Sequence, residues 1–320
     1  MSIGHAQAPV PAIEWKLSTA LGPAYPQGKG GETWARLVTE RSAGRIKVAH
    51  FPGASLAQRD PAREFAALRD GAINLAVGSA SSWALQVKEL NVFGLPWLFP
   101  DPASVERALA GEVGTDVSGA LQAAGVVVLA STSDAFRELA TTRPVHVPAD
   151  LVGLRIRVPP GPLAFDVLIA LGCLPASMTA TDARAALARG SLDGELLSVA
   201  AFGASRLYAA GVPRLLVWGM AADALFFAVN RRDWDSLGDS DREIVRLAAR
   251  DAARESSLLA RQQMSAQALA GLARDGAKVT RLTGAGREPF RQKTRSVYER
   301  WSTIIGADLV QAAEKAAVGP

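Results

Sequence analysis

The sequence predicts a two-domain α/β protein, and three observations lead to that class. The chain has 320 residues, more than one hydrophobic core usually supports. Strand-like and helix-like segments alternate along it, which indicates largely parallel sheets with helices on both faces. The two halves are not separated by an obvious linker, so we expect the chain to cross between the domains more than once.

The first quarter of the chain has a β-α-β-α-β order. Gly44 opens and Pro52 closes one of its strands, and Gly71 follows the end of a helix. Apolar runs bounded by such residues predict strands at residues 14–21, 44–52 and 73–79. Helices are predicted at residues 32–41 and 61–70.

A further helix and strand come next, and a second alternating set begins at residue 154. Asp101 as N-cap, Pro102 in the first turn and Gly111 as terminator predict a helix between them. Strands are predicted at residues 125–132 and 154–159, and helices at residues 163–171 and 181–190.

One helix is predicted to be unusually long, from about Ser240 to Asp275. Ser240 and Glu243 fit a capping box, and Gly276 would end the helix. At more than about 30 residues it exceeds the usual globular length. A helix of this length can run along both domains and brace them.

The composition is that of a globular protein without a nucleic-acid signature. The net charge is only +4, and the 35 Lys and Arg are interspersed with 31 acidic residues. A dense basic stripe with aromatic residues is absent, so we expect no nucleic-acid partner. No apolar run reaches the roughly 18 to 20 residues of a membrane span, so we expect the chain not to cross a membrane. The single cysteine, Cys173, stands in an apolar run that indicates a buried thiol.

The sequence offers no convincing catalytic centre. The three histidines, His5, His50 and His146, are isolated and lack metal-ligand spacing. Nucleophile-elbow, Walker and dinucleotide-binding patterns are missing as well. Asp193 and Glu195 supply two carboxylates, but the "GSLDGE" segment indicates a turn first. We therefore expect no enzyme activity, no cofactor and no metal.

Two arginines flank Ile156 in the predicted strand "LRIRVP". Residues two apart on a strand point to one face, and arginine is seldom fully buried without a partner. Arg157 can offer a planar pair of N–H donors to a carboxylate, which lysine cannot match. Taken alone, the pattern favours a surface or salt-bridged arginine.

Several segments together resemble the DctP-like family, the periplasmic solute-binding proteins of tripartite ATP-independent periplasmic (TRAP) transporters. The resemblance runs from about Trp15 to Ile305, and it rests on the order and spacing of its segments. They are "GRIKVAHFPGASLA", "LRDGAINLAVGSAS", "FGLPWLFPDPASVERAL", "PADLVGLRIRVP", "ALARGSLDGE" and "FFAVNRRDWDSLGDSDREIV".

The resemblance implies the two-domain periplasmic-binding-protein fold, with a ligand cleft and a long brace helix spanning both domains. Domain I would comprise residues 12–134 and about 223–262, and domain II residues 135–222 and about 263–320. The implied role is periplasmic: a monomer captures a small organic acid by domain closure and delivers it to TRAP membrane permease subunits. The Ala6-Gln7-Ala8 fragment would then end a removed export signal rather than belong to an N-terminal tail.

The resemblance also assigns a carboxylate site. Arg157 matches the family arginine that pairs with the ligand carboxylate, and Arg137 matches a second arginine that often assists. Arg155 stands where the family commonly has lysine, so we assign it to solvent or an ion pair. Stranding a buried guanidinium without a counter-ion costs several kcal/mol, so closure should favour acids.

Departures from the family pattern suggest a roomier, more apolar pocket. Leu197 replaces an asparagine that often binds ligand, and Ala180 replaces aromatic bulk. We therefore expect an aromatic or branched 2-oxo or 2-hydroxy monocarboxylate. The residues expected to line its pocket are Ser79, Ser82, Ala180, Leu197, Trp218 and Tyr25, with the serines as hydrogen-bond partners and Tyr25 as a lid contact.

Three alternatives stay open at this point. Leu197 and Trp218 could simply pack in the core. The protein could report its ligand to a receptor instead of delivering it for transport. An enzyme on the same scaffold would use Asp193 with Glu195, or Cys173, but no base, metal set or cofactor loop accompanies them.

Overall fold

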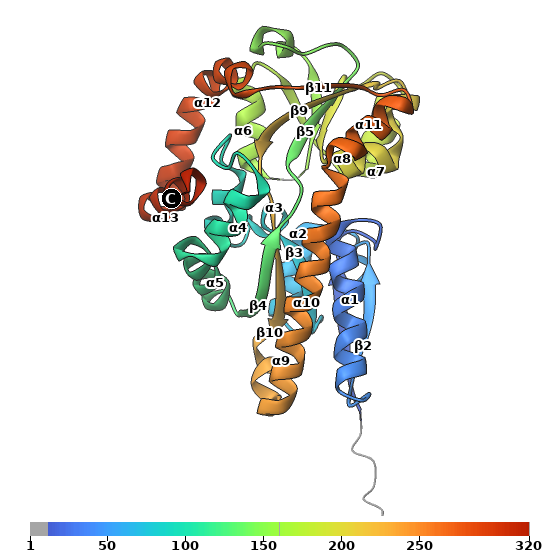
Figure 1. Ribbon diagram of the computed structural model, residues 1–320, viewed down its shortest axis with the longest axis vertical. Helices are drawn as coiled ribbons and strands as arrows, with labels where there is room; N and C mark the ends of the chain where they lie inside the picture. Colours follow the sequence, from blue (N-terminus) through green and yellow to red (C-terminus); the bar gives the residue numbers. More distant parts are fainter. Residues whose placement is uncertain (1–11, 160, 320) are drawn as a thin grey trace, which may run out of the picture.

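Two sheets with helices around them form the molecule, as a computed structural model shows for residues 12–159 and 161–319 (Figure 1). His5 and the Ala6–Ala8 fragment lie outside the described residues. Each sheet has its own helices and one core cluster of its own, and the largest cluster joins side chains of both sheets. The predicted two-domain α/β class is confirmed. No helix among the described residues has the length and apolarity that a bilayer crossing requires.

The first sheet has the strand order β2-β1-β3-β10-β4. The neighbours of β1 run parallel to it, as predicted, whereas β10 runs antiparallel to both of its own neighbours. The strands are β1 (Ile13–Thr19), β2 (Ile46–Pro52), β3 (Leu75–Ser79), β4 (Val126–Ser133) and β10 (Ala224–Asn230). Strand β10 is the late segment that returns to a sheet built by the first part of the chain.

The second sheet has the order β11-β9-β5-β8-β6-β7. It is mixed, because β5 pairs antiparallel with β8 and β9, whereas β6 is parallel to β7 and β8. The strands are β5 (Arg137–Thr141), β6 (Arg155–Val158), β7 (Leu174–Ser177), β8 (Gly194–Leu197), β9 (Arg214–Ala221) and β11 (Lys278–Arg281). The predicted strand at residues 154–159 is therefore present as β6.

Helices cover the sheets on both sides (Figure 1). The helices that precede β4 in the chain are α1 (Pro26–Arg41), η1 (Ser55–Ala57), α2 (Pro61–Arg69), α3 (Ala80–Trp83), η2 (Lys88–Gly94), α4 (Pro102–Ala110) and α5 (Glu112–Ala123). The helices between β5 and β9 are η3 (Pro148–Leu151), α6 (Pro162–Ala170), α7 (Ala180–Ala188), α8 (Val199–Ser205) and η4 (Leu207–Ala209). Helix α9 (Arg231–Ser236) follows β10 and packs on the first sheet.

Two predicted helix starts can be compared directly. Asp101 caps α4 as expected, because its carboxylate accepts the Ser104 N–H at 2.8 Å. Helix α1 begins six residues earlier than predicted, at Pro26, and includes the glycines of "GKGG". A Cβ on Gly30 would come within 2.7 Å of the Phe227 ring. The glycine is therefore needed where α1 packs closely on β10.

The predicted long helix is two helices, α10 (Asp239–Gln263) and α11 (Ala266–Arg274). The single-helix prediction was wrong because Ser265 stops it: its hydroxyl caps α11 by accepting the Ala268 N–H at 3.1 Å. The predicted capping box was wrong too, since the N-cap is Gly238 and makes no side-chain bond. Helix α10 packs on α1 and β4 of the first sheet, and α11 packs on β11 of the second, so the pair bridges both sheets.

The chain crosses between the sheets at Asp134–Phe136, at Ala222–Asp223 and between α10 and α11. The last helices, α12 (Gly284–Ile305) and α13 (Ala307–Val318), return toward the first sheet, and α13 packs on α4 and α5. We propose to keep the predicted domain boundaries at the three crossings and to assign α13 to domain I.

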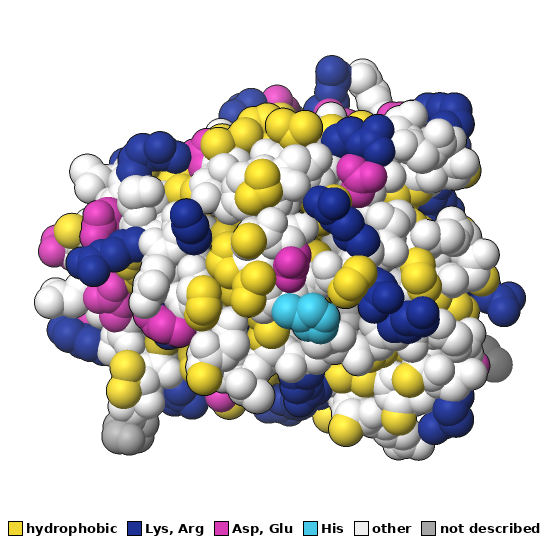
Figure 2. All heavy atoms as spheres, turned by 90° about the horizontal axis from the view of Figure 1, so that it is seen from above, with side chains coloured by type: hydrophobic (Ala, Val, Ile, Leu, Met, Phe, Trp, Pro, Cys, Tyr) yellow, Lys and Arg dark blue, Asp and Glu magenta, His cyan; other side chains and the backbone are white. Residues whose placement is uncertain are grey.

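The outer face of the second domain carries mixed side chains. In Figure 2, which looks at the molecule from above, Lys and Arg are scattered among hydrophobic and uncharged groups and form no stripe across that face. The exposed hydrophobic residues of this domain include Val147, Val152, Ile169 and Leu174, around the edge strand β7.

Candidate functional site

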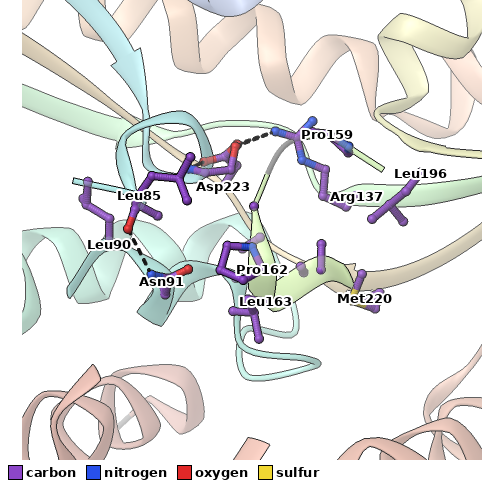
Figure 3. Close-up of a pocket in the computed structure, with 17 residues that line it drawn as sticks. Leu85, Leu90, Asn91, Arg137, Pro159, Pro162, Leu163, Leu196, Met220 and Asp223 are labelled. Carbon is purple, nitrogen blue, oxygen red and sulfur yellow. Dashed lines mark hydrogen bonds and ion pairs between the residues drawn. The ribbon is translucent and has the colours of Figure 1, made fainter. Parts of the chain in front are cut away.

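A cavity of about 60 Å³ lies where the chain crosses between the sheets (Figure 3). Its walls come from α3 and η2 beside the first sheet, from the β6–α6 segment, and from β5, β8 and β9 of the second sheet. Most of the lining is apolar. The four polar or charged side chains among the described lining residues are Ser81, Asn91, Arg137 and Asp223.

Arg137 is the one cationic side chain among the described residues of the cavity lining. Its Nη2 donates to the Ser81 Oγ at 2.9 Å and to the Asp223 Oδ2 at 2.5 Å. Asp223 is 1% exposed and also accepts the Ser81 N–H and hydroxyl, which holds both residues in place. These bonds use Nη2 only, so Nε and Nη1 of Arg137 retain donor capacity for an anion.

A distortion of the second sheet holds the segment of β5 that carries Arg137. Between Arg137 and Leu139 the pairing of β5 shifts from Ala221 to Leu216 of β9, so β9 bulges there. Gly219 adopts φ +62 within the bulge. The buried Glu138 carboxylate accepts the N–H groups of Trp218 and Gly219 at 2.8 and 2.9 Å, which satisfies backbone donors that the bulge leaves unpaired.

Arg157 lies inside the second sheet and does not line this cavity. Its Nη1 donates to the Glu195 Oε1 at 2.8 Å, and its Nε donates to the Met178 carbonyl at 3.0 Å. Burial lowers the pKa of the Arg157 guanidinium, Arg137 acts in the same direction, and Glu195 opposes both. Arg157 is thus buried as predicted, but the counter-ion it meets in the fold is Glu195.

The other residues expected in the pocket lie outside the cavity lining. Ser79 caps α3 and donates its hydroxyl to Ser82 at 2.9 Å, so both serines belong to a local turn network. Tyr25 is the half-buried N-cap of α1, and Ala180 is exposed at the start of α7.

Leu197 and Trp218 pack in the core. Leu197 is 4% exposed, and Trp218 is fully buried between Trp97 and Phe290. The Trp218 Nε1 donates to the Arg137 carbonyl at 3.1 Å, so it supports the strand behind the cavity. We do not retain Trp218 as a pocket residue.

Residue-by-residue reasoning missed several lining residues, among them Ser81, Asn91, Leu163, Met220 and Asp223. Two of them carry a signal that could have been used. Asn91 is a polar residue within the otherwise apolar "LNVFGLPWLF" segment, and Asp223 interrupts the apolar run "GMAADALFF". A lone polar side chain in such a run is either paired or functional. Ser81 lies between the two serines that were expected.

The groups considered for catalysis have structural partners. Asp193 binds the exposed Arg155 through two hydrogen bonds of 2.9 Å between their side chains, and Glu195 binds Arg157. Burial raises the pKa of the Cys173 thiol to about 12, which makes it a poor nucleophile. Among the described residues, no group of three His, Cys, Asp or Glu side chains could hold a metal ion.

A cavity at the crossing between two α/β domains is the arrangement of a solute-binding protein, and the comparisons identify the family. Residues 17–303 match the family model DctP, bacterial extracellular solute-binding protein, family 7. The chain therefore belongs to this family of TRAP solute-binding proteins, whose members are periplasmic and are not enzymes. The resemblance predicted from sequence is confirmed.

A solved structure supplies a close relative. The TRAP periplasmic solute-binding protein of Ralstonia eutropha H16, with bound (S)-2-hydroxy-2-methyl-3-oxobutanoate ((S)-2-acetolactate), is 43% identical, with a TM-score of 0.92. The match covers 95% of this chain and 98% of that chain.

Among the relatives found by sequence, two match most of this chain. A solute-binding protein of Chromohalobacter salexigens is 27% identical over 91% of this chain and 85% of its own length. The uncharacterized protein y4mM of Sinorhizobium fredii is 30% identical over 88% of this chain, which spans only about half (51%) of that relative.

Proposed function

We propose that this protein is the periplasmic solute-binding subunit of a TRAP transporter and captures a short branched monocarboxylate that carries a 2-hydroxy or 2-oxo group. The carboxylate binds Arg137, and the branched carbon skeleton lies against the apolar wall. The observation that carries the proposal is the pairing of one available guanidinium with a lining that is otherwise almost wholly apolar.

The charge count favours one carboxylate over two. A dicarboxylate needs a second cation to offset its second charge, because an unpaired charge in a buried site costs several kcal/mol. Arg137 is the one cationic side chain among the described lining residues, and although it pairs with Asp223 it keeps two donor nitrogens at the cavity wall, enough for one carboxylate. Arg157 pairs with Glu195 and lies outside that lining. We keep Arg157 as an assisting residue rather than the main anchor.

The lining favours a branched acid over a sugar acid or a large aromatic acid. Leu85, Leu90, Leu163, Leu196 and Met220 offer no hydrogen bonds to a row of hydroxyl groups. Burying methyl groups against them contributes about 0.8 kcal/mol per carbon. The Ralstonia eutropha relative, at 43% identity, was solved with (S)-2-acetolactate, a branched monocarboxylate of this class.

Delivery to TRAP membrane subunits in the periplasm follows from the family as the expected role. The alternative is a sensing protein that reports the same ligand to a receptor, and it would use the same site. Transport predicts that deleting the gene abolishes ligand-dependent uptake by cells. Unchanged uptake with loss of a transcriptional response would favour sensing instead.

A calorimetric ligand screen tests the chemical class directly. The purified protein would be titrated with (S)-2-acetolactate, 3-methyl-2-oxobutanoate, phenylpyruvate, succinate and galactonate. We expect the two branched monocarboxylates to bind most tightly. Binding of succinate or galactonate, with none of the monocarboxylates, would overturn the proposal.

A further inference from the structure

The polar groups of the cavity differ in how much of their hydrogen-bonding capacity is already used. Asp223 accepts four hydrogen bonds, from the Ser81 N–H and hydroxyl, the Ala224 N–H and the Arg137 Nη2. The Ser81 hydroxyl donates to Asp223 and accepts from Arg137. Neither side chain therefore has much left to offer a ligand.

Asn91 has one amide end in use and the other free. Its Nδ2 donates to the Lys88 carbonyl at 2.9 Å and to the Ala84 carbonyl at 3.4 Å. The reversed amide would place Oδ1 against these two carbonyl oxygens, so the orientation is fixed by its partners. Oδ1 then lies on the opposite side, toward Pro162, as Figure 3 shows.

Asn91 is 8% exposed as a whole residue, and its Oδ1 is not among the fully enclosed atoms that lack a partner, so this oxygen is open to the cavity that Asn91 lines. A ligand that fills the cavity would displace water from the oxygen and would leave it unsatisfied unless the ligand donates a hydrogen bond to it. The hydrogen bonds recorded among the described residues include none to Asn91 Oδ1. The cavity thus offers a ligand two complementary groups: a cationic donor at Arg137 and a neutral acceptor at Asn91.

We propose that the Asn91 Oδ1 accepts a hydrogen bond from a hydroxyl group of the ligand, so that the site selects a 2-hydroxy acid over the 2-oxo acid of the same skeleton. This inference rests on the proposed function and narrows its ligand class. A hydroxyl satisfies the amide oxygen by donating to it. A keto oxygen cannot donate, and it would bring two acceptors together and leave both unsatisfied.

The first test uses the wild-type protein and three acids with one carbon skeleton. The probes are (S)-2-hydroxy-3-methylbutanoate, 3-methyl-2-oxobutanoate and 3-methylbutanoate, each measured by isothermal titration calorimetry. We expect the hydroxy acid to bind about 3- to 10-fold more tightly than the oxo acid, the range for one neutral hydrogen bond. Equal affinity for the hydroxy and oxo acids, or preference for the oxo acid, would overturn the inference.

The second test is Asn91→Leu, which removes the acceptor at similar volume. Affinity for the hydroxy acid should fall about 3- to 10-fold, while affinity for the oxo acid stays the same or rises. The matched control is Leu85→Met, a lining residue without a hydrogen bond, which should change both affinities alike. An equal loss for both acids in Asn91→Leu would argue against the assignment.

These outcomes separate the two proposals. If the three monocarboxylates bind without hydroxyl preference, Asn91 has no selective role and the proposed function stands. If none of them binds and succinate or galactonate does, the proposed function fails and this inference fails with it. The wild-type series needs no variant, so a folding defect in Asn91→Leu leaves the first test decisive.

Discussion

Two of the arginine–carboxylate pairs at the second sheet, Arg157 with Glu195 and Arg137 with Asp223, differ in where they hold the guanidinium. Arg157 and Glu195 are side chains of neighbouring strands, with 10% and 7% of their surfaces exposed. Arg137 and Asp223 pair at the crossing between the sheets, and the Arg137 side chain is 23% exposed. The first pair neutralises itself inside the sheet, whereas the second holds a guanidinium at the wall of a cavity.

On the basis of this comparison we propose Arg137, rather than Arg157, as the main contact of the ligand carboxylate. Glu195 stands opposite Arg157 on the neighbouring strand β8, and its carboxylate accepts a hydrogen bond from the Arg157 guanidinium at 2.8 Å. Asp223 binds one nitrogen of Arg137, just as Glu195 binds one nitrogen of Arg157, but of the two arginines only Arg137 lies in the cavity lining, where its Nε and Nη1 can meet a ligand. Recognition is therefore expected at Arg137, and structural stabilisation at Arg157.

Removal of the Arg137 side chain should have the largest effect. Arg137→Ala is expected to weaken binding of (S)-2-acetolactate by about 100-fold or more, because the carboxylate loses its charged partner. Calorimetry would measure the loss. Arg155→Ala is the matched control: it removes an exposed arginine that binds Asp193, and it should leave affinity unchanged. Near-normal affinity in Arg137→Ala would reverse the roles assigned to the two pairs.

Glu195→Gln should act on stability. It leaves the Arg157 charge buried without a counter-ion, which typically costs about 3 to 5 kcal/mol of the free energy of unfolding. Asp193→Asn breaks the exposed pair with Arg155 and should cost at most about 1 kcal/mol. Urea denaturation at pH 7 would measure both variants. A smaller loss in Glu195→Gln than in Asp193→Asn would show that the buried pair is not structural.

The free energy of unfolding should depend on pH through Asp134, which lies in the crossing segment Asp134–Phe136. Burial raises the pKa of Asp134 to about 7, and the negative charge of Asp223 acts in the same direction. The folded protein keeps this proton up to about pH 7, whereas an unfolded chain loses it near 3.8. The resulting stabilisation is complete below pH 3.8 and is lost as the pH rises through 7.

Urea denaturation at several pH values between 5 and 8 would therefore measure how much Asp134 contributes to the pH dependence of the free energy of unfolding. The wild type should lose stability over this range, and Asp134→Asn should flatten the slope. Glu64→Gln should flatten it as well, because burial raises the pKa of Glu64 to about 7. Asp150→Asn is the control, since two backbone N–H groups lower the pKa of Asp150 and move its titration below this range. An unchanged slope in Asp134→Asn would contradict the assignment.

The sequence was sufficient for the fold because its periodic and capping signals are local. The strand at Arg155–Val158 and the Asp101 cap were predicted from a few neighbouring residues. The break at Ser265 was missed because a serine can either continue a helix or cap the next one, and the choice depends on packing against the second sheet.

The site was predicted less completely because its residues meet only in three dimensions. Arg137 was identified through a family motif, but the partner that orients it, Asp223, lies 86 residues away along the chain. The same limit applies to Arg157: the sequence shows that it needs an anion, and only the pairing of β6 with β8 shows that Glu195 is that anion. The long-range contacts are what place Arg137, and not Arg157, in the cavity lining.

The smallest expected effect distinguishes two serines that are neighbours in sequence. Ser81→Ala removes one of the two partners of the Arg137 Nη2, which should loosen the guanidinium and weaken binding of (S)-2-acetolactate about 3- to 10-fold. Ser82→Ala removes a hydroxyl that accepts from Ser79 within the turn and should leave affinity unchanged. Calorimetry on both variants measures the difference. If Ser82→Ala weakened binding and Ser81→Ala did not, the turn network rather than the Arg137 cluster would form the ligand contact, and the contrast between the two arginine pairs would lose its basis.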